Sequence, residues 1–247
     1  MLLELRHVSK RYGAMMVVPD LSLSVAEGDF VGVIGPNGAG KTTVFGLISG
    51  GLRCDAGAVV LGGLDVTALG ADERCRAGIG RTFQIPHPFQ GMTAYENALV
   101  AATFGAGLRG RQAQALARDA IERCGLEAAA DILAARLTLL QRKRLELARA
   151  IATRPRLLLL DEVAGGLTDG EMNQLLQLVV SIHRSGVTVL WIEHLVHALV
   201  SAAGRLVVLA DGRLLSDGDP GSVMQDRAVR ETYLGSDIDE ELTHAEH

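Results

Sequence analysis

The sequence predicts an α/β fold in which buried parallel strands alternate with helices. Phe30–Ile34 and Leu157–Leu160 are short aliphatic runs, the pattern of strands covered on both faces. Apolar residues at helical spacing, from Val44 to Ile48, follow the first run. The composition agrees, since 48% of the residues are hydrophobic and only 4% are aromatic. At 247 residues the chain can form one large domain with a subdomain inserted.

Antiparallel strands are expected within residues 1–84. Leu21, Leu23 and Val25 alternate with polar neighbours, as in a half-exposed strand. Ala58–Leu61 is followed by Gly62–Gly63, which predicts a hairpin. This part of the chain therefore combines antiparallel strands with the first buried strand and its helix.

Helices are expected over residues 85–153. Thr93 and Glu96 form a capping-box pattern that opens a helix through Ala102. A second helix ends at Gly125, and a third begins near Thr138. The apolar face of the second helix consists of Ala113, Leu116, Ala117, Ala120, Ile121 and Cys124.

The α/β pattern returns after residue 153. A helix is expected over 170–184, and strands are expected over Val187–Ile192 and Leu206–Leu209, with a hairpin turn at Asp211–Gly212. These zones divide one domain into a core of 1–84 and 154–235, a helical subdomain of 85–153 and an acidic tail of 236–247.

A glycine-rich loop between the first buried strand and its helix fits the pattern G-x-x-x-x-G-K-S/T. Glycines let successive backbone N–H groups point at phosphate oxygens, and the helix directs its positive end to the same place. Lys41 would reach the β- and γ-phosphates, and the Thr42 hydroxyl would ligate Mg²⁺. The alternative, a glycine-rich turn that happens to contain a lysine, is disfavoured by the flanking strand and helix. The residues predicted to bind a nucleoside triphosphate are Gly35, Pro36, Asn37, Gly38, Ala39, Gly40, Lys41, Thr42 and Thr43.

Two carboxylates end the second buried strand. Asp161 and Glu162 follow four leucines, at the carboxyl edge where open α/β sheets bind ligands. Asp161 can hold Mg²⁺ through its water, and Glu162 can polarise an attacking water as a general base. The alternative is a pair of surface acids that ends a strand. Together with the phosphate loop, the pair predicts hydrolysis of the triphosphate.

The order of these motifs resembles the nucleotide-binding subunit of an ABC transporter. The phosphate loop is followed by Gln84, by a glutamine-containing helix start at Thr138–Gln141, by Asp161–Glu162 and by His194. The resemblance covers essentially the whole chain. It implies a P-loop NTPase fold with a RecA-like core, an N-terminal antiparallel β subdomain and an inserted α-helical subdomain. It also implies ATP and Mg²⁺ as cofactors.

Roles for single residues follow from this resemblance. It implies that Gln84 senses Mg²⁺ and water and couples to a membrane partner, while His194 contacts the γ-phosphate and orients the water. It implies that Tyr12 stacks on adenine with Val18 as its apolar neighbour. Without the resemblance, each of these residues would be interpreted as a packing or surface residue with no functional role. His197 lies close to His194 in sequence, but no third zinc ligand lies near them in the sequence, so a zinc site is not expected.

The signature segment departs from the family's usual Leu-Ser-Gly-Gly-Gln. Thr138 and Gln141 keep a capping-box pattern, so a helix N-terminus can face the γ-phosphate held by a second subunit. Leu140 adds bulk where glycine lets the backbone approach phosphate, which implies slow or partner-dependent hydrolysis. Val163 and Thr168 replace the proline and aspartate usual after the strand. The segment reads Leu137, Thr138, Leu139, Leu140 and Gln141.

Several short segments look like the ATPase subunits of branched-chain amino-acid importers, and urea or amide importers share much of them. The resemblance implies a second ABC ATPase subunit, identical or different, together with transmembrane permease subunits and an extracytoplasmic substrate-binding protein. Three other functions stay open: an ATPase for lipid or lipopolysaccharide transport, an ABC ATPase acting on DNA or ribosomes, and a regulator without turnover. The segments are Arg81–Gln84, Pro86–Asn97, Leu145–Ala150, Ile192–His194 and Tyr233–Gly235.

Charge and hydropathy narrow the expected partners. The net charge of −5 predicts no nucleic-acid partner, and the run Arg142–Arg144 is interpreted as a solvated helix face. No stretch approaches 18 consecutive apolar residues, and the N-terminus does not read as a signal peptide. We therefore expect a peripheral protein at the cytoplasmic face of the membrane. Cys54, Cys75 and Cys124 are odd in number and far apart, which predicts reduced, structural thiols.

Overall fold

The structure, a computed structural model, describes residues 1–194 and 196–233. It divides into two compact units. The strand-rich unit consists of Met1–Gly70 and the residues from Thr188 onward, and the helix-rich unit consists of Ala71–Val187. The helical segment expected over 85–153 falls within the helix-rich unit, and its boundaries stay a prediction. The acidic tail expected over 236–247 lies outside the described residues, as do Leu234 and Gly235.

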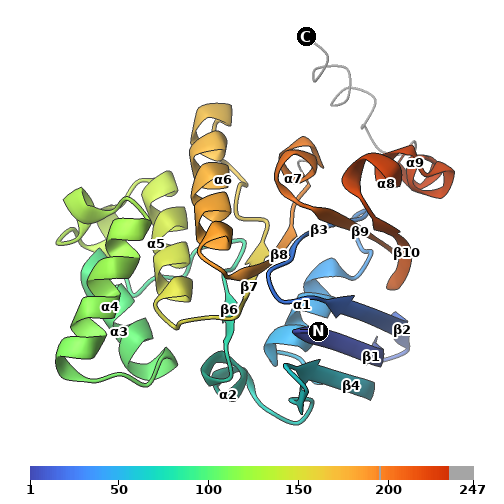
Figure 1. The fold of residues 1–247 in the computed structure, drawn as a ribbon, viewed down its shortest axis with the longest axis horizontal. Helices are drawn as coiled ribbons and strands as arrows, with labels where there is room; N and C mark the ends of the chain where they lie inside the picture. The colour runs from blue at the N-terminus through green and yellow to red at the C-terminus, as the bar shows by residue number, and fades with distance from the viewer. Residues whose placement is uncertain (195, 234–247) are drawn as a thin grey trace. The chain divides into compact units, whose positions relative to one another are not determined.

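The strand-rich unit contains an antiparallel sheet in the order β2-β1-β4-β5 (Figure 1). Leu21, Leu23 and Val25 are buried along one strand of this sheet, which confirms the expected half-exposed strand. Leu61 pairs with Leu64 across the two glycines, which confirms the hairpin. The strands are β1 (Leu3–Tyr12), β2 (Met15–Val25), β4 (Ala56–Leu61) and β5 (Leu64–Asp65).

A second set of strands in the same unit carries the phosphate loop. The central strand, β3 (Phe30–Ile34), is buried along its whole length and runs parallel to β8 (Thr188–Ile192) and β9 (Arg205–Ala210). Strand β10 (Arg213–Gly218) pairs with β9 in the antiparallel sense through the expected turn at Asp211–Gly212. The helices of this unit are α1 (Lys41–Ser49), α7 (Val196–Ala202), α8 (Pro220–Gln225) and α9 (Arg227–Tyr233).

The helix-rich unit contains one parallel pair of strands, β6 (Ile79–Arg81) and β7 (Leu157–Asp161). Every residue of β7 is buried, as its aliphatic sequence predicts. Helices α3, α4 and α5 pack against one another in this unit (Figure 1). The helices are α2 (Ala71–Arg76), α3 (Ala94–Val100), the π-helix η1 (Ala101–Gly105), α4 (Gly110–Arg123), the 3₁₀ turns η2 (Glu127–Ala129) and η3 (Ala134–Arg136), α5 (Leu139–Ile151) and α6 (Asp169–Arg184).

Capping boxes determine where α3, α5 and α6 begin. The side chains of Thr93 and Thr138 accept hydrogen bonds from the main chain three residues on, which confirms both expected boxes. Thr168 forms a third box with Glu171 at the start of α6. The helix expected through Ala102 is α-helical only to Val100. It continues as η1, a π-helix, in which hydrogen bonds join residues five apart instead of four.

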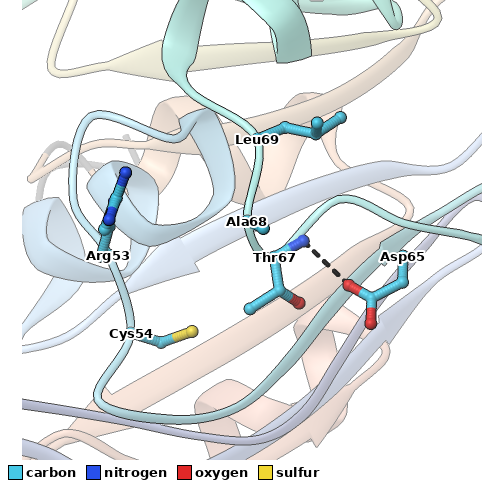
Figure 2. Close-up of a pocket in the computed structure, with 6 residues that line it drawn as sticks. All are labelled: Arg53, Cys54, Asp65, Thr67, Ala68 and Leu69. Atoms are coloured by element: carbon cyan, nitrogen blue, oxygen red, sulfur yellow. Dashed lines mark hydrogen bonds between the residues drawn. The ribbon is translucent and has the colours of Figure 1, made fainter.

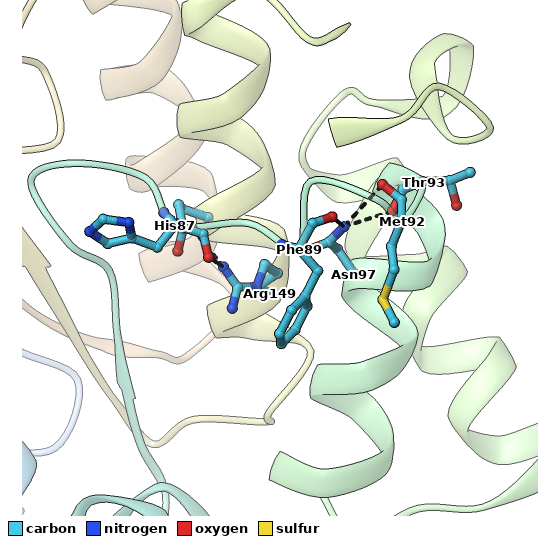
Figure 3. A network of polar contacts seen from close by, with 7 residues as sticks. His87, Phe89, Met92, Thr93, Asn97 and Arg149 are labelled. Atoms are coloured by element: carbon cyan, nitrogen blue, oxygen red, sulfur yellow. Dashed lines mark hydrogen bonds and ion pairs between the residues drawn. The ribbon is translucent and has the colours of Figure 1, made fainter. Parts of the chain in front are cut away.

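Asn97 of α3 fixes the loop that precedes this helix. The residue is fully buried, and its Nδ2 donates to the carbonyls of Phe89 and Thr93 at 3.1 and 2.9 Å (Figure 3). Its Oδ1 accepts a hydrogen bond from the N–H of Phe89 at 2.8 Å. Because buried polar groups are costly without partners, these bonds favour a single conformation of the loop.

Replacing Asn97 with Ala is expected to lower the free energy of unfolding by about 1–3 kcal/mol, because a buried donor and buried acceptors lose their partner. Urea unfolding followed by circular dichroism measures this change. Asn173→Ala is the matched control, since Asn173 is exposed on α6, and its effect is expected to stay within about 0.5 kcal/mol. Equal losses in both variants would contradict the assigned role of Asn97.

Candidate nucleotide-binding site

The glycine-rich loop connects β3 to α1 in the strand-rich unit. Gly38 and Gly40 have φ of 82° and 89°, values that favour glycine, and Gly40 is the N-cap of α1. Lys41 is 6% exposed, and its ammonium group donates to the carbonyl oxygens of Gly35 and Pro36 at 2.6 and 3.1 Å. The side chain therefore folds back along the loop. A buried lysine held by main-chain oxygens is a compact positive group beside a helix N-terminus, which suits a bound polyphosphate.

Close main-chain contacts define the position of this loop. A Cβ on Gly35 would lie 2.2 Å from the carbonyl oxygen of Leu209, so no side chain fits there. The N–H of Gly212 donates to the carbonyl of Ala39 at 3.1 Å, and a Cβ on Gly212 would lie 1.9 Å from the Val17 oxygen. The loop is thus supported by the end of β9 and by the turn that follows it.

The two residues expected beside adenine differ in exposure. Tyr12 ends β1, is 46% exposed, and lies with its ring centroid 5.8 Å from the ammonium group of Lys10. Val18 has no exposed surface. The exposed ring of Tyr12 is available for stacking, whereas Val18 packs in the core; contact of either residue with adenine stays a prediction.

Asp161, at the carboxyl end of β7, is paired with an arginine from the neighbouring strand. The carboxylate is buried, and its Oδ2 accepts a hydrogen bond from Arg81 Nη2 at 2.9 Å. Parallel pairing places Arg81 opposite Leu159, two residues before the aspartate. Burial of an unpaired carboxylate would be very costly, so the guanidinium compensates its charge. Sequence patterns predicted no role for Arg81, because its ion pair with Asp161 joins residues that are distant in the chain.

Glu162, the next residue, has a strained backbone and a defined partner. Its φ is 48°, in the left-handed region that non-glycine residues rarely adopt. Its Oε2 accepts a hydrogen bond from Nε2 of Gln84 at 2.5 Å. The structure thus brings together two predicted site residues from distant parts of the chain. Backbone strain of this kind costs about 1–3 kcal/mol and is concentrated at functional sites.

His194 follows β8 and is exposed, while the residue before it is buried. The carboxylate of Glu193 accepts hydrogen bonds from the indole Nε1 of Trp191 and from the N–H of His194, both at 3.3 Å. These contacts fix the main chain at His194 and leave its ring on the surface of the strand-rich unit. Its contact with a γ-phosphate stays a prediction.

The degenerate signature segment still forms a helix N-terminus. Thr138 Oγ1 accepts from the N–H of Gln141 at 3.3 Å, and Gln141 Oε1 accepts from the N–H of Thr138 at 3.0 Å. The box does not use the N–H groups of Leu139 and Leu140. Leu139 is 41% exposed and Leu140 is half-buried, so both side chains contribute to the surface at the start of α5.

The family model described as ABC transporter matches residues 18–165. The chain belongs to the ABC transporter family. A branched-chain amino-acid transport ATP-binding protein, BraF of Pseudomonas aeruginosa, is 37% identical over 249 residues that cover 95% of this chain and 98% of the relative. The lipopolysaccharide export ATP-binding protein LptB of Haemophilus influenzae is 32% identical over 234 residues, which cover 95% and 97%.

Solved structures confirm the fold of this ABC protein. A nucleotide-free ATP-binding cassette from an ABC transporter superposes with a TM-score of 0.85 and 28% identity over 95% of this chain and 99% of its own. A cassette in its ADP conformation gives a TM-score of 0.84 at the same identity, over 95% and 99%. The predicted P-loop NTPase fold with an antiparallel β subdomain and helices is therefore confirmed. The chain is an ABC transporter ATP-binding subunit and an ATPase.

The interpretation of the basic run on α5 of this ATPase as a solvated face was wrong for Lys143, and Arg144 is only half-exposed. Lys143 is 4% exposed, and its ammonium group donates to the main-chain carbonyl of Gln84 at 2.8 Å. Its neighbour Arg142 is exposed, as expected. Because isolated charges are rarely buried, a basic run normally indicates a solvated face. One sequence signal could have indicated the buried lysine. The spacing of Lys143, Glu146 and Arg149 places three charged residues on one side of a leucine-rich helix.

Two of the three cysteines of this ATPase are poor candidates for nucleophilic chemistry. Burial raises the pKa of the Cys124 thiol to about 12, and burial also raises the pKa of Cys75. All three cysteines are free thiols in the structure. Cys124 and Cys75 therefore stay protonated at neutral pH and do not act as nucleophiles.

A surface pocket in the strand-rich unit is formed by residues that follow α1 in the sequence. The N–H of Thr67 donates to the Asp65 carboxylate at 2.9 Å on one of its sides (Figure 2). The phosphate loop does not contribute to the lining, so we assign this pocket no part in nucleotide binding. It is lined by Arg53, Cys54, Asp65, Thr67, Ala68 and Leu69.

Proposed function

We propose that this ATPase drives uptake of branched-chain amino acids as a peripheral subunit at the cytoplasmic face of the membrane. The match to BraF along nearly the whole chain supports this substrate class. The described residues include no helix that is both long and apolar enough to cross a membrane. From the resemblance to importer ATPases, the proposed partners are transmembrane permease subunits, an extracytoplasmic substrate-binding protein and a second ABC ATPase subunit.

In the proposed reaction, the phosphate loop binds the triphosphate of ATP. The loop N–H groups and Lys41 would hold the phosphate oxygens, and Tyr12 would stack on adenine. The residues proposed to hold Mg²⁺ are Thr42, Gln84 and Asp161, which offer the hydroxyl, amide and carboxylate oxygens that this ion prefers. Thr42 offers an exposed hydroxyl, and Asp161 offers a carboxylate at the end of β7. When bound, Mg²⁺ would neutralise charge on the phosphates.

Glu162 is the proposed general base. Its carboxylate would take a proton from the attacking water, and Gln84 would hold that water and the carboxylate in place. His194 would contact the γ-phosphate and orient the water. The observation that carries this mechanism is the hydrogen bond between Gln84 and Glu162, whose own backbone is in the left-handed region.

The second subunit and the permease would use two further surfaces of the helix-rich unit. The N-terminus of α5 at Thr138–Gln141 would face the γ-phosphate of ATP held by the second subunit, so that ATP favours a closed pair of ATPases. A solved ABC cassette of 25% identity and TM-score 0.80, covering 89% of this chain and 99% of its own, is described as dimeric. The proposed permease contact involves exposed apolar side chains that lie close to Gln84 in the sequence: Phe83, Ile85, Phe89 and Met92.

Replacing Leu140 with Gly is expected to raise the ATPase rate two- to fivefold if the leucine side chain keeps the backbone from the phosphate, which corresponds to about 0.5–1 kcal/mol of activation free energy. Phosphate release in the assembled transporter measures this rate. Leu139→Gly is the matched control, because it adds the same helix flexibility one residue earlier. An unchanged rate in Leu140→Gly would mean that the main chain already accommodates leucine.

Lipopolysaccharide export is the second candidate function, because LptB of Acidithiobacillus ferridurans is 36% identical over 95% of this chain and 97% of the relative. Urea or amide uptake and ATP-dependent regulation without turnover remain further alternatives. Uptake of labelled leucine into cells that carry Lys41→Ala in place of the natural chain separates these functions. The proposal expects loss of leucine uptake; normal leucine uptake with defective lipopolysaccharide export would favour the second candidate.

A further inference from the structure

Three charged side chains of α5 bind the main chain of the loop that contains Gln84. Lys143 donates to the carbonyl oxygen of Gln84 at 2.8 Å. Glu146 Oε1 accepts from the N–H of His87 at 2.9 Å. Arg149 Nη1 donates to the carbonyl oxygen of His87 at 2.8 Å (Figure 3). The spacing of three residues places these side chains along one side of the helix.

Two of the three side chains are buried, and the contacts are linked to one another. Lys143 and Glu146 are each 4% exposed. Glu146 Oε1 also accepts from Arg149 Nη1 at 2.6 Å, so one carboxylate binds both the loop and the arginine. Removal of one partner from such a network leaves a buried polar group uncompensated. The network therefore holds the loop in a single position relative to α5.

Beyond His87, the same loop is held by the arginine and by a second helix. The Arg149 guanidinium lies 5.2 Å from the ring centroid of Phe89, and Asn97 of α3 binds the main chain of Phe89 (Figure 3). Before His87, the Gln84 side chain reaches Glu162. The direction of the Gln84 amide therefore depends on where α5 holds its main chain.

We propose that Lys143, Glu146 and Arg149 are positioning residues that fix Gln84 against Glu162 and connect this pair to the helix that begins at Thr138. This proposal rests on the proposed function of Glu162 and Gln84. None of the three α5 side chains would contact ATP or the attacking water. They act through main-chain hydrogen bonds, and a displaced Gln84 would misplace the proposed base.

The decisive variant is Lys143→Met, which keeps the length of the side chain and removes the donor to the Gln84 carbonyl. We expect the kcat for ATP hydrolysis to fall about tenfold, because small misplacements of catalytic groups are costly. The KM for ATP and the affinity for a fluorescent ATP analogue should change less than about twofold. Lys143→Arg keeps a donor and should restore at least half of the rate.

Arg144→Met is the matched control. Arg144 lies next to Lys143 on α5, yet its Nη1 donates to the carbonyl of Gly125 at 3.3 Å and its Nη2 donates to Gln174 Oε1 at 2.8 Å, and neither partner belongs to the Gln84 loop. Its kcat is expected to stay within twofold of the natural protein. A parallel loss of rate in both variants would mean that helix stability, rather than loop position, is responsible and would overturn the proposal.

A second measurement separates this proposal from the proposed function. In a Gln84→Ala background the side chain to be positioned is absent, so Lys143→Met should have little further effect on kcat. A full tenfold loss in that background would overturn the positioning role.

If Glu162→Gln stops turnover while Lys143→Met does not slow it, the positioning proposal fails and the proposed base stands. If Glu162→Gln leaves turnover intact, the proposed base fails by itself.

Discussion

Glu162→Gln is expected to bind ATP normally and to hydrolyse it about 10²–10⁴-fold more slowly, because glutamine cannot accept the proton of the attacking water. The substitution keeps the shape of the side chain and an oxygen that can accept the hydrogen bond from Gln84. The local structure should therefore survive. Phosphate release and the binding of a fluorescent ATP analogue, measured on the same preparation, report the two properties separately.

Glu122→Gln provides the control for this experiment. Glu122 is an exposed residue of α4, so its neutralisation removes the same charge away from the proposed base. Its turnover is expected to stay near that of the natural protein. Hydrolysis by Glu162→Gln at the natural rate would remove Glu162 as the base.

Lys41→Ala is expected to weaken ATP binding about 10- to 100-fold, because a hydrogen bond to a charged group contributes about 1.5–3 kcal/mol. The natural ammonium group is already directed along the loop by the carbonyls of Gly35 and Pro36. Isothermal titration calorimetry with ATP measures the change in affinity.

Arg53→Ala is the control for this loss of a positive charge. Arg53 is exposed in the pocket that follows α1 and outside the phosphate loop. Its ATP affinity is expected to stay within about twofold of the natural value. Natural affinity in Lys41→Ala would contradict the assignment of the phosphate loop.

Local sequence patterns accounted for much of the fold. The strand Phe30–Ile34, the aliphatic strand before Asp161 and the capping boxes at Thr93 and Thr138 are all decided by neighbouring residues, and the structure has each of them. Such elements follow from periodicity and from side chains that bind their own backbone. The family's motif order then added the P-loop NTPase fold, which the solved cassettes confirm.

The polar pairs of the site could not be predicted in the same way. Arg81 binds Asp161, and Lys143 binds the main chain of Gln84, across long stretches of sequence. No local pattern indicates which distant carbonyl or carboxylate a buried cation will meet. For this reason the basic run on α5 was interpreted as solvated. The burial of Lys143 depends on the tertiary fold.

Thr168 illustrates a substitution whose structural consequence is now visible. The family usually has aspartate at this position after the strand, and here the threonine begins α6 through a capping box with Glu171. Hydrogen bonds from Thr168 lower the pKa of the Glu171 carboxyl. The start of α6 is therefore retained despite the change of residue.

The most direct test of the account is a double-mutant cycle on kcat for ATP hydrolysis with Gln84→Ala, Glu162→Gln and the double variant. If the two residues act as one unit around the attacking water, the double variant should be no slower than Glu162→Gln alone. Rate losses that multiply would show that the two side chains act independently, and that result would contradict the central role given to their hydrogen bond.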